Sequence, residues 1–327
     1  MTDQGAFQKL AERHRSELLA HCYRMLGSFH DAEDCVQETY LRAWRGFDTF
    51  AGSGLVRNWL YKIATNTCLN TLSRRRRSYR TLPEDTGPPS DGMPQGKPST
   101  EISWLEPYPD LLLEGIPDSA PGPHALYELR ESVTLAFVAA IQRLPPRQRA
   151  ALLLCDVLGW TAADTASMLE SSTASVNSAL QRARATLSQD RHSKSKPSMN
   201  EQQTALLDDY LRAWERMDIA LFASLLCEDT VLSMPPWRQW YLGREDICSF
   251  LAQAWESQSY GGFRLSRTAA NGCPAFAVYS RSRADGAAWT PHSLHVIVIE
   301  GGRIAGVTMF LGFKDLEKLT GLEAGGI

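Results

Sequence analysis

Apolar residues recur every three to four positions over most of the first 190 residues. This period predicts α-helices over residues 7–25, 31–44, 55–73, 125–144, 147–158, 161–169 and 172–187. Beyond residue 200 the pattern changes, and helices over 205–217, 221–226 and 246–255 precede strand-like runs over 263–268, 275–279, 293–300 and 304–311. Asn271-Gly272 and Gly301-Gly302 supply turns between those runs. The chain therefore predicts an all-α part followed by an α+β domain with an antiparallel meander.

Two hydrophilic segments separate these elements. Residues 81–126 hold ten of the seventeen prolines and eight acidic residues against one basic residue, a composition that cannot fold alone. One run in it, WLEPYPDLL at 104–112, is too apolar for a solvated tether, so we expect it to dock. The predicted organisation is domains over 1–80, 125–190 and 201–327, with linkers over 81–124 and 191–200.

Charge divides along the same boundaries. The net charge is +5 over residues 1–80, −7 over 81–126, +3 over 127–196 and −4 over 197–327. Two basic blocks joined by an acidic connector indicate a polyanion-binding half, which the whole-chain charge of −3 conceals. No apolar run reaches the length of a membrane span and the N-terminus has no signal-peptide pattern, so we expect a cytoplasmic protein. The seven cysteines include no CxxC pair, which favours reduced thiols over disulfides or a metal site.

Two of the early helices carry a second line of residues outside their buried faces. On the helix over 31–44 that line is Asp34, Gln37, Glu38, Leu41 and Trp44, which suits a protein-docking face unless Trp44 packs into the core. On the helix over 55–73, Trp59, Lys62, Asn66 and Asn70 form a stripe that ends in the basic run 74–77. An aromatic residue among amides and cations favours single-stranded nucleic acid, although a basic run is also typical of a solvated helix end.

The helix over 172–187 has a polar face without a carboxylate. That face contains Ser175, Asn177, Ser178, Gln181, Arg182 and Arg184. These side chains can reach base edges and phosphates in a DNA major groove. A short helix with a Thr161–Asp164 capping pattern and a tight turn at 170–172 precede it. The arrangement predicts a helix-turn-helix.

Three motifs resemble the extracytoplasmic-function group of bacterial sigma-70-type factors. They are HDAEDCVQETYLRAW, WLYKIATNTCLNTLSRRRR and LPPRQRAALLLCDVLGWTAADTASMLESSTASVNSALQRARATL, and the resemblance covers residues 5–80 and 125–190. It implies an RNA polymerase specificity subunit and no cofactor. Region two of such a subunit grips the polymerase clamp helices and opens the minus-ten element, and region four binds the minus-thirty-five element and the flap.

The resemblance also implies site residues. The clamp-binding positions are Asp31, Asp34, Gln37, Glu38, Leu41 and Trp44. The minus-ten positions are Phe50, Ser53, Arg57, Asn58, Trp59, Lys62, Asn66, Asn70, Arg74, Arg75, Arg76 and Arg77. The minus-thirty-five positions are Ser172, Thr173, Ser175, Asn177, Ser178, Gln181, Arg182 and Arg184. The loop 51–54 departs from the family pattern in being small and less basic, and the acidic linker is expected to lie in the polymerase channel.

Residues 201–320 resemble a SnoaL-like cone domain of the nuclear-transport-factor-two-like type. The resemblance rests on LLDDYLRAWERMDIALFASLLCEDTVLSMPP, GREDICSFL and the following meander, and implies that the fused domain controls activity in cis. Three roles stay open: an intramolecular contact, binding of a small-molecule ligand, or isomerase/cyclase-type catalysis. The candidate pocket residues are Trp237, Trp240, Tyr241, Arg244 and His295. His292 and His295, three apart on a strand, are expected to point to opposite faces and to form no metal site.

The most consistent function is therefore promoter recognition and melting as a sigma factor bound to core RNA polymerase. The alternatives are a DNA-binding protein fused to a small-molecule-binding or enzyme domain, and a helix-turn-helix repressor. A repressor would not need the docking face that ends in Trp44.

Overall fold

The computed structural model describes residues 2–47, 56–75, 79–94, 96–113, 132–188, 200–256, 259–284 and 287–312. The chain divides into two compact units, each built from two segments. Unit 1 comprises residues 1–80 and 105–193, and unit 2 comprises residues 81–104 and 194–327.

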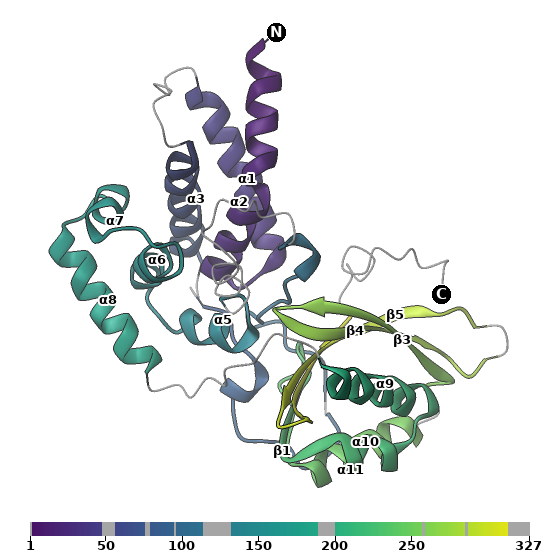
Figure 1. The fold of residues 1–327 in the computed structure, drawn as a ribbon. Coiled ribbons are helices and arrows are strands. Elements are labelled where there is room, and N and C mark those ends of the chain that lie inside the picture. The colour runs from purple at the N-terminus through teal and green to yellow at the C-terminus, as the bar shows by residue number, and fades with distance from the viewer. Residues whose placement is uncertain are drawn as a thin grey trace. The chain divides into compact units, whose positions relative to one another are not determined.

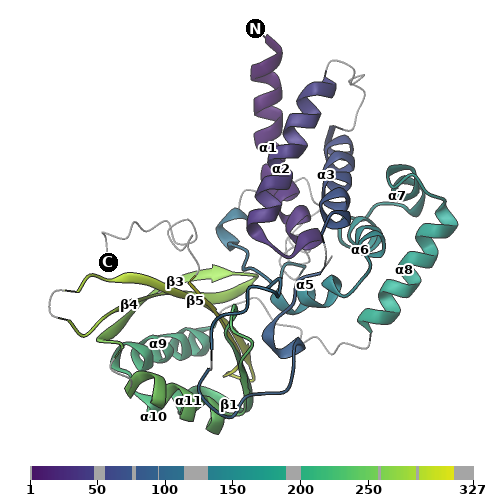
Figure 2. The same cartoon turned by 180° about the vertical axis from the view of Figure 1, so that it is seen from behind.

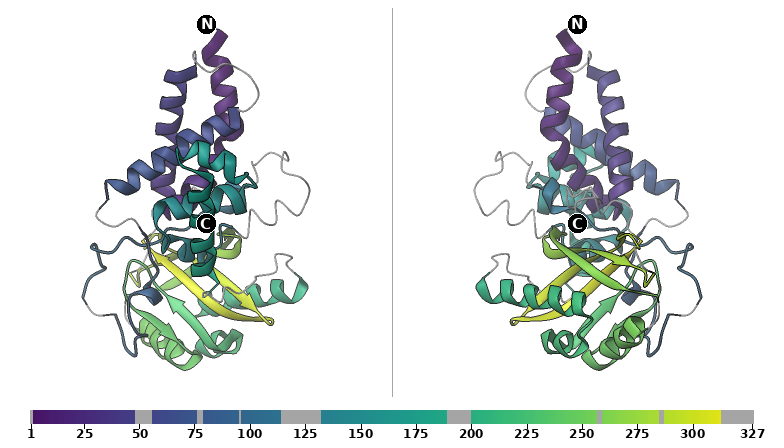
Figure 3. Two further views of the ribbon diagram at one scale, coloured as in Figure 1. Left: turned by 90° about the vertical axis from the view of Figure 1, so that its left-hand side faces the viewer. Right: turned by 90° about the vertical axis from the view of Figure 1, so that its right-hand side faces the viewer.

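Unit 1 begins with α1 (Thr2–Leu26), α2 (Phe29–Gly46) and α3 (Val56–Ser73), which lie side by side (Figures 1 and 3). Gly27 ends α1 with a φ of 68°, which glycine adopts without steric cost. Ser28 then caps α2, its hydroxyl accepting a hydrogen bond from the Asp31 backbone N–H. The apolar period places the buried residues of all three helices in one core, as the sequence predicts.

The second half of unit 1 consists of short helices. They are α5 (Leu135–Gln142), α6 (Pro146–Leu152), the π-helical turn η4 (Leu153–Val157), α7 (Ala162–Met168) and α8 (Thr173–Leu187). The helix expected over 125–144 is shorter within the described residues, because Thr134 caps it by accepting from the Phe137 N–H. Thr161 caps α7 and Ser172 caps α8, which confirms the helix-turn-helix.

The apolar run of the first linker docks within unit 1. Leu105, Tyr108 and Leu113 are buried, and the Tyr108 ring lies 4.9 Å from the ring of Tyr23. The Tyr23 hydroxyl donates a 2.8 Å hydrogen bond to the Glu106 carbonyl. A short 3₁₀ turn, η3 (Asp110–Leu112), ends the described part of this run.

Unit 2 contains α9 (Glu201–Arg216), α10 (Ile219–Leu225) and α11 (Arg244–Glu256), which pack against a curved sheet (Figure 1). The strands are β1 (Leu226–Ser233), β2 (Trp240–Leu242), β3 (Gly262–Ala270), β4 (Cys273–Arg281), β5 (Thr290–Glu300) and β6 (Arg303–Leu311). Their order is β2-β1-β6-β5-β4-β3. The meander β3 to β6 confirms the sequence prediction, and both predicted turns have the positive φ angles that glycine and asparagine tolerate.

The sheet differs from the prediction at one end. Strands β1 and β2 were not expected, and Leu226, predicted to end a helix, begins β1 instead. Strand β1 pairs in parallel with β6, so the sheet is mixed rather than a pure antiparallel meander. Strand β1 was not predicted because its pairing strand, β6, is distant in sequence, and such pairing leaves no pattern in the neighbouring residues.

Residues 81–104 of the first linker belong to unit 2, where they run beside β1 (Figure 2). Leu82, Pro83 and Trp104 are buried there, and Pro83–Asp85 forms the 3₁₀ turn η2. The segment is therefore anchored on the domain at its ends, although most of the described residues between 85 and 101 are exposed. The segment has too few apolar residues to fold alone, so it takes a defined structure only by packing on a folded domain.

Candidate nucleic-acid interface

The exposed face of α2 presents an apolar pair next to polar groups. Leu41 is 55% and Trp44 42% exposed, although the Trp44 ring also packs 5.3 Å from the ring of Phe7. Asp34 and Gln37 are exposed, and the Glu38 carboxylate accepts a 2.6 Å hydrogen bond from Arg42. Large apolar side chains left exposed beside charges are typical of a protein-binding surface.

Asp31 differs from the other predicted docking residues because its carboxylate is used inside unit 1. It forms ion pairs with Arg75 at 2.6 Å and Arg80 at 2.5 Å. Burial alone would raise the pKa of Asp31, but the hydrogen bonds and charges of the two arginines hold it below its ordinary value. Arg80 also bonds Glu106 at 3.2 Å, so this cluster ties the segment that follows α3 to the docked linker.

The predicted minus-ten stripe on α3 contains both exposed and internally bonded side chains. Asn70 and Arg74 are exposed, and Asn58, Trp59 and Asn66 are half-buried. Arg57 instead donates a 2.8 Å hydrogen bond to Glu17 and lies over the Tyr61 ring. Lys62 is 3.9 Å from Glu170, and both side chains are exposed, so this pair is weak. Four predicted positions lie outside the described residues: Phe50, Ser53, Arg76 and Arg77.

Helix α8 presents its predicted polar face to solvent. Val176, Ala179, Leu180 and Ala183 are buried against the unit. The predicted minus-thirty-five residues are all exposed: Ser172, Thr173, Ser175, Asn177, Ser178, Gln181, Arg182 and Arg184. The Arg184 guanidinium forms a two-pronged ion pair with Asp156, at 2.9 and 2.6 Å, so its charge is already partly compensated.

A buried polar network joins the two halves of unit 1, and sequence reasoning did not predict it. The Arg149 side chain is fully buried and donates hydrogen bonds to the carbonyls of Met25, Ile141 and Leu144. Gln142 donates a 3.0 Å hydrogen bond to the Arg24 carbonyl. The two donors satisfy carbonyls at the end of α1 that the helix itself leaves unpaired. The sequence carries no local signal for this role, because Arg149 follows Arg147 and Gln148 and precedes the apolar run 150–155.

Four of the predicted pocket residues of unit 2 hydrogen-bond to separate partners. The Trp240 indole donates to the Gly87 carbonyl at 2.9 Å, and the Tyr241 hydroxyl donates to the Gly92 carbonyl at 2.7 Å. Arg244 donates to the Leu226 carbonyl, and Trp237 is half-buried. His295 is instead fully buried between sheet and helix, 2.9 Å from the Tyr210 hydroxyl. The described cavity walls of unit 2 contain none of Trp237, Trp240, Tyr241, Arg244 and His295, and a pocket formed by these residues stays a prediction.

His292 and His295 lie on the same side of β5, contrary to the prediction. The pairing of β4 with β5 shifts register between Val278 and Tyr279, and this irregularity turns His292 inward. Both rings contact the Ser293 hydroxyl at 2.9 Å, and His292 reaches the Tyr260 hydroxyl at 3.3 Å. Burial lowers the pKa of His292 to about 4, and burial together with the nearby His292 lowers the pKa of His295, so both rings are neutral near pH 7.

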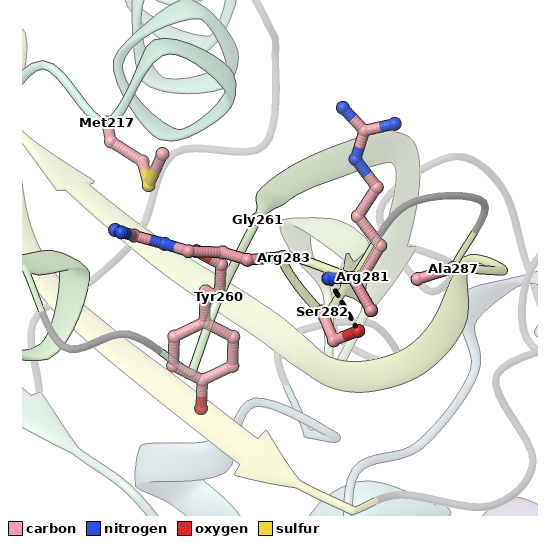
Figure 4. A pocket seen from close by; sticks show the side chains of 8 residues that line it. Met217, Tyr260, Gly261, Arg281, Ser282, Arg283 and Ala287 are labelled. Carbon is pink, nitrogen blue, oxygen red and sulfur yellow. Dashed lines mark hydrogen bonds between the residues drawn. The ribbon is translucent and has the colours of Figure 1, made fainter.

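A solvent-open cavity of about 530 Å³ lies at the end of unit 2 where β4 leads into β5. Its walls include Met217, Tyr260 and Arg283, and Figure 4 shows Arg283 extending between the other two while Arg281 points away. The Tyr260 hydroxyl faces His292 rather than the cavity. Among the described lining residues of the cavity, no carboxylate or imidazole faces inward to form the acid–base pair an isomerase needs.

Within the described ranges, no group of three or more His, Cys, Asp or Glu side chains is arranged to hold a metal ion. A search of the same ranges finds no helix with the length and apolar character required to cross a bilayer.

Three family models match the chain in order. Sigma-70 region 2 matches residues 10–78, Sigma-70, region 4 matches residues 134–187, and the SnoaL-like domain matches residues 207–307.

Relatives share this order. The ECF RNA polymerase sigma factor SigG of Mycobacterium tuberculosis is 46% identical over 314 residues, which cover 94% of this chain and 82% of that protein. The factor SigM of the same organism is 31% identical over 186 residues, covering 57% of this chain and 76% of the relative. The crystal structure of M. tuberculosis SigJ, 20% identical, matches the fold with a TM-score of 0.58 over 95% of this chain and 98% of that one. The chain therefore belongs to the extracytoplasmic-function (ECF) RNA polymerase sigma factors.

Proposed function

We propose that the chain binds core RNA polymerase and directs it to promoters, where it recognises and melts DNA. The observation that carries this proposal is the exposed polar face of α8, which holds serines, amides and arginines and no carboxylate. A second surface, around Leu41 and Trp44, has the composition of a protein-docking site. A repressor would need the first surface only.

In this proposal α8 enters the major groove of the minus-thirty-five element. Asn177 and Gln181 are long enough to reach base edges, and Arg182 is placed for a phosphate. The front of the helix carries Thr173 and Ser175, whose short side chains favour backbone and phosphate contacts there. Capture of unstacked minus-ten bases falls to α3, where Trp59 and Asn66 lie next to the basic run.

Promoter binding requires unit 1 to open. The two promoter elements are separated by about 25 base pairs, or roughly 85 Å of B-DNA. Helices α3 and α6 pack within one compact unit, held by the Arg149 and Gln142 hydrogen bonds to the end of α1. A unit closed in this way does not span the two elements, so core binding must separate region four from region two.

We also propose that the C-terminal domain modulates this activity in cis and is not an enzyme. In support, His292 and His295 both hydrogen-bond to Ser293, and neither ring lines the cavity described above. The domain's Trp240 and Tyr241 are engaged by the linker. Their role is therefore an internal contact.

The experiment is binding of the purified chain to core polymerase and to promoter DNA. The proposal expects co-purification with core, and promoter binding that is strong only in the presence of core. Tight binding to duplex DNA without core, together with no retention of core, would favour the repressor. Removing residues 201–327 should change transcript yield, and equal yields would exclude modulation in cis.

A further inference from the structure

The linker segment 81–104 forms a closed loop within unit 2. At its base, the Thr81 N–H donates to the Ser103 carbonyl at 3.1 Å, and Thr81 and Trp104 form a parallel β-bridge. The Trp104 indole folds back to the Ser99 carbonyl at 3.2 Å. The two ends of the segment are thus fastened together, although its proline-rich composition favours an extended chain.

The body of the loop is bonded to the edge of the sheet. The Ser90 N–H donates to the Trp240 carbonyl at 2.7 Å, and the Trp240 indole donates back to the Gly87 carbonyl at 2.9 Å. Strand β2 is the outer strand of the sheet, so the linker pairs with backbone that would otherwise be open. The Tyr241 hydroxyl adds a 2.7 Å hydrogen bond to Gly92, which brings three separate bonds from one short strand.

A second point of attachment lies beyond β2. The Ser99 N–H donates to the Pro236 carbonyl at 3.0 Å. Glu101 and Arg238 are 4.0 Å apart, but both side chains are largely exposed, so their attraction adds little. The acidic linker is therefore held mainly by backbone hydrogen bonds and by the Trp240 indole and Tyr241 hydroxyl donors, and ion pairs contribute little.

Clamping the loop shortens the tether between region two and region four. Fully extended, residues 81–104 would cover roughly 80 Å, yet their ends are joined by a single hydrogen bond at the base. Arg80 and Leu105, which flank the loop, both belong to unit 1. While these hydrogen bonds hold residues 81–104 on the domain, the segment adds almost no length to the linker between region two and region four, which must extend on a promoter.

The Glu84 carboxylate destabilises the bound state of residues 81–104. One carboxyl oxygen of Glu84, Oε2, is shielded from water and has no hydrogen-bond partner. Burial raises the pKa of Glu84 above its ordinary value, although the nearby Ser233 hydroxyl opposes the shift. A carboxylate regains its full hydration only when the loop leaves the domain, so this residue favours release.

We propose that the C-terminal domain acts on the sigma factor by clamping residues 81–104 as a closed loop on Trp240 and Tyr241, and that promoter binding requires the clamp to release, with Glu84 as the group that favours release. The proposal rests on the sigma function proposed above and adds the element through which the domain acts.

Hydrogen exchange measured by mass spectrometry tests the clamp in the full chain. Within residues 86–100, the Ser90 and Ser99 amides donate to the domain, and they should exchange at least tenfold more slowly than in the free peptide 81–104. Tyr241→Phe should speed their exchange about fivefold by removing one hydrogen bond. Glu84→Gln should slow it several-fold, because the amide carries no charge to rehydrate.

Two matched variants serve as controls. Tyr279→Phe is the control for Tyr241→Phe, because it removes a buried hydroxyl of the same sheet that makes no hydrogen bond within the described part of the chain. Glu101→Gln is the control for Glu84→Gln, because it neutralises an exposed acid in the same loop. Both should leave the exchange of the Ser90 and Ser99 amides within about twofold of the original chain. A control that changes it as much as its partner variant would show that the effect is not local and would overturn the assignment of Tyr241 or Glu84.

The same amides are then followed in the holoenzyme on promoter DNA. The proposal expects their protection to fall to that of the free peptide, and Glu84→Gln to lower the yield of open complexes. Protection that persists in the open complex overturns the release step, and peptide-like exchange in the free chain overturns the clamp. Failure of the chain to bind core at all would refute the sigma function instead, and the exchange of the free chain would still decide whether the clamp exists.

Discussion

Arg182 and Arg184 are two residues apart on the exposed face of α8, yet they stand in different electrostatic settings. Arg184 is bound by both oxygens of Asp156, at 2.9 and 2.6 Å. Within the described ranges, no such carboxylate pairs with the Arg182 guanidinium. We therefore expect Arg182→Ala to weaken promoter binding more than Arg184→Ala, although the sequence presents the two arginines as equivalent.

The magnitude follows from counterion release. Each neutralised phosphate contributes about 0.9 to the slope of log K against log salt. Losing Arg182 should lower the slope by about that amount, so a fourfold rise in salt changes the ratio of original to variant affinity by about 3.5-fold. Arg184→Ala should change the slope far less, because its charge is already shared with Asp156. Asp156→Ala frees Arg184 and should increase both affinity and slope.

The assay is fluorescence anisotropy of labelled promoter DNA titrated with holoenzyme over a range of salt. Circular dichroism of each variant checks that α8 is intact. Equal slopes for Arg182→Ala and the original chain, or an Asp156→Ala variant that binds less tightly, would refute the reasoning from charge compensation.

Three further predictions concern docking, packing and pH. Glu38→Ala combined with Trp44→Ala should weaken binding to core by about 2 kcal/mol or more, seen in co-purification, while circular dichroism shows that the helices remain folded. Arg149→Met should destabilise unit 1 by about 3 kcal/mol in urea unfolding, because several buried carbonyls lose their donor, whereas Arg147→Met at an exposed position should cost under about 0.5 kcal/mol. The pKa of His292 is lowered to about 4, so the unfolded chain takes up its proton first as the pH falls. His292 should therefore contribute fully to the stability of unit 2 above about pH 7 and cost about 2 kcal/mol at pH 5, and His292→Gln should remove that part of the loss, while the part due to buried His295, whose pKa is also lowered, remains.

Local patterns predicted the helices well, because their signals lie within a few residues. Thr161, Ser172 and Gly27 each mark a helix boundary by their own chemistry, and the structure places caps or a stop at all of them. The buried and exposed faces of α8 also follow from its period alone. These features depend on neighbours in sequence, which a single chain reveals.

Contacts between distant segments were not predictable in the same way. The Asp31 carboxylate fits a docking face by pattern, but Arg75 and Arg80 bind it inside unit 1. The prolines and acids of 81–104 indicate a tether, and nothing local shows that Tyr241 binds its Gly92 carbonyl. His292 turned inward because of a register shift that depends on the partner strand. Each of these outcomes is decided by a partner far along the chain.

Transcription from defined templates tests the central claim most directly. Core polymerase is supplied with the full chain and a pool of genomic fragments, and the 5′ ends of the transcripts are mapped. The account predicts discrete start sites that are absent with core alone, share upstream elements at minus ten and minus thirty-five, and diminish with Arg182→Ala. A transcript pattern identical to that of core alone would contradict it.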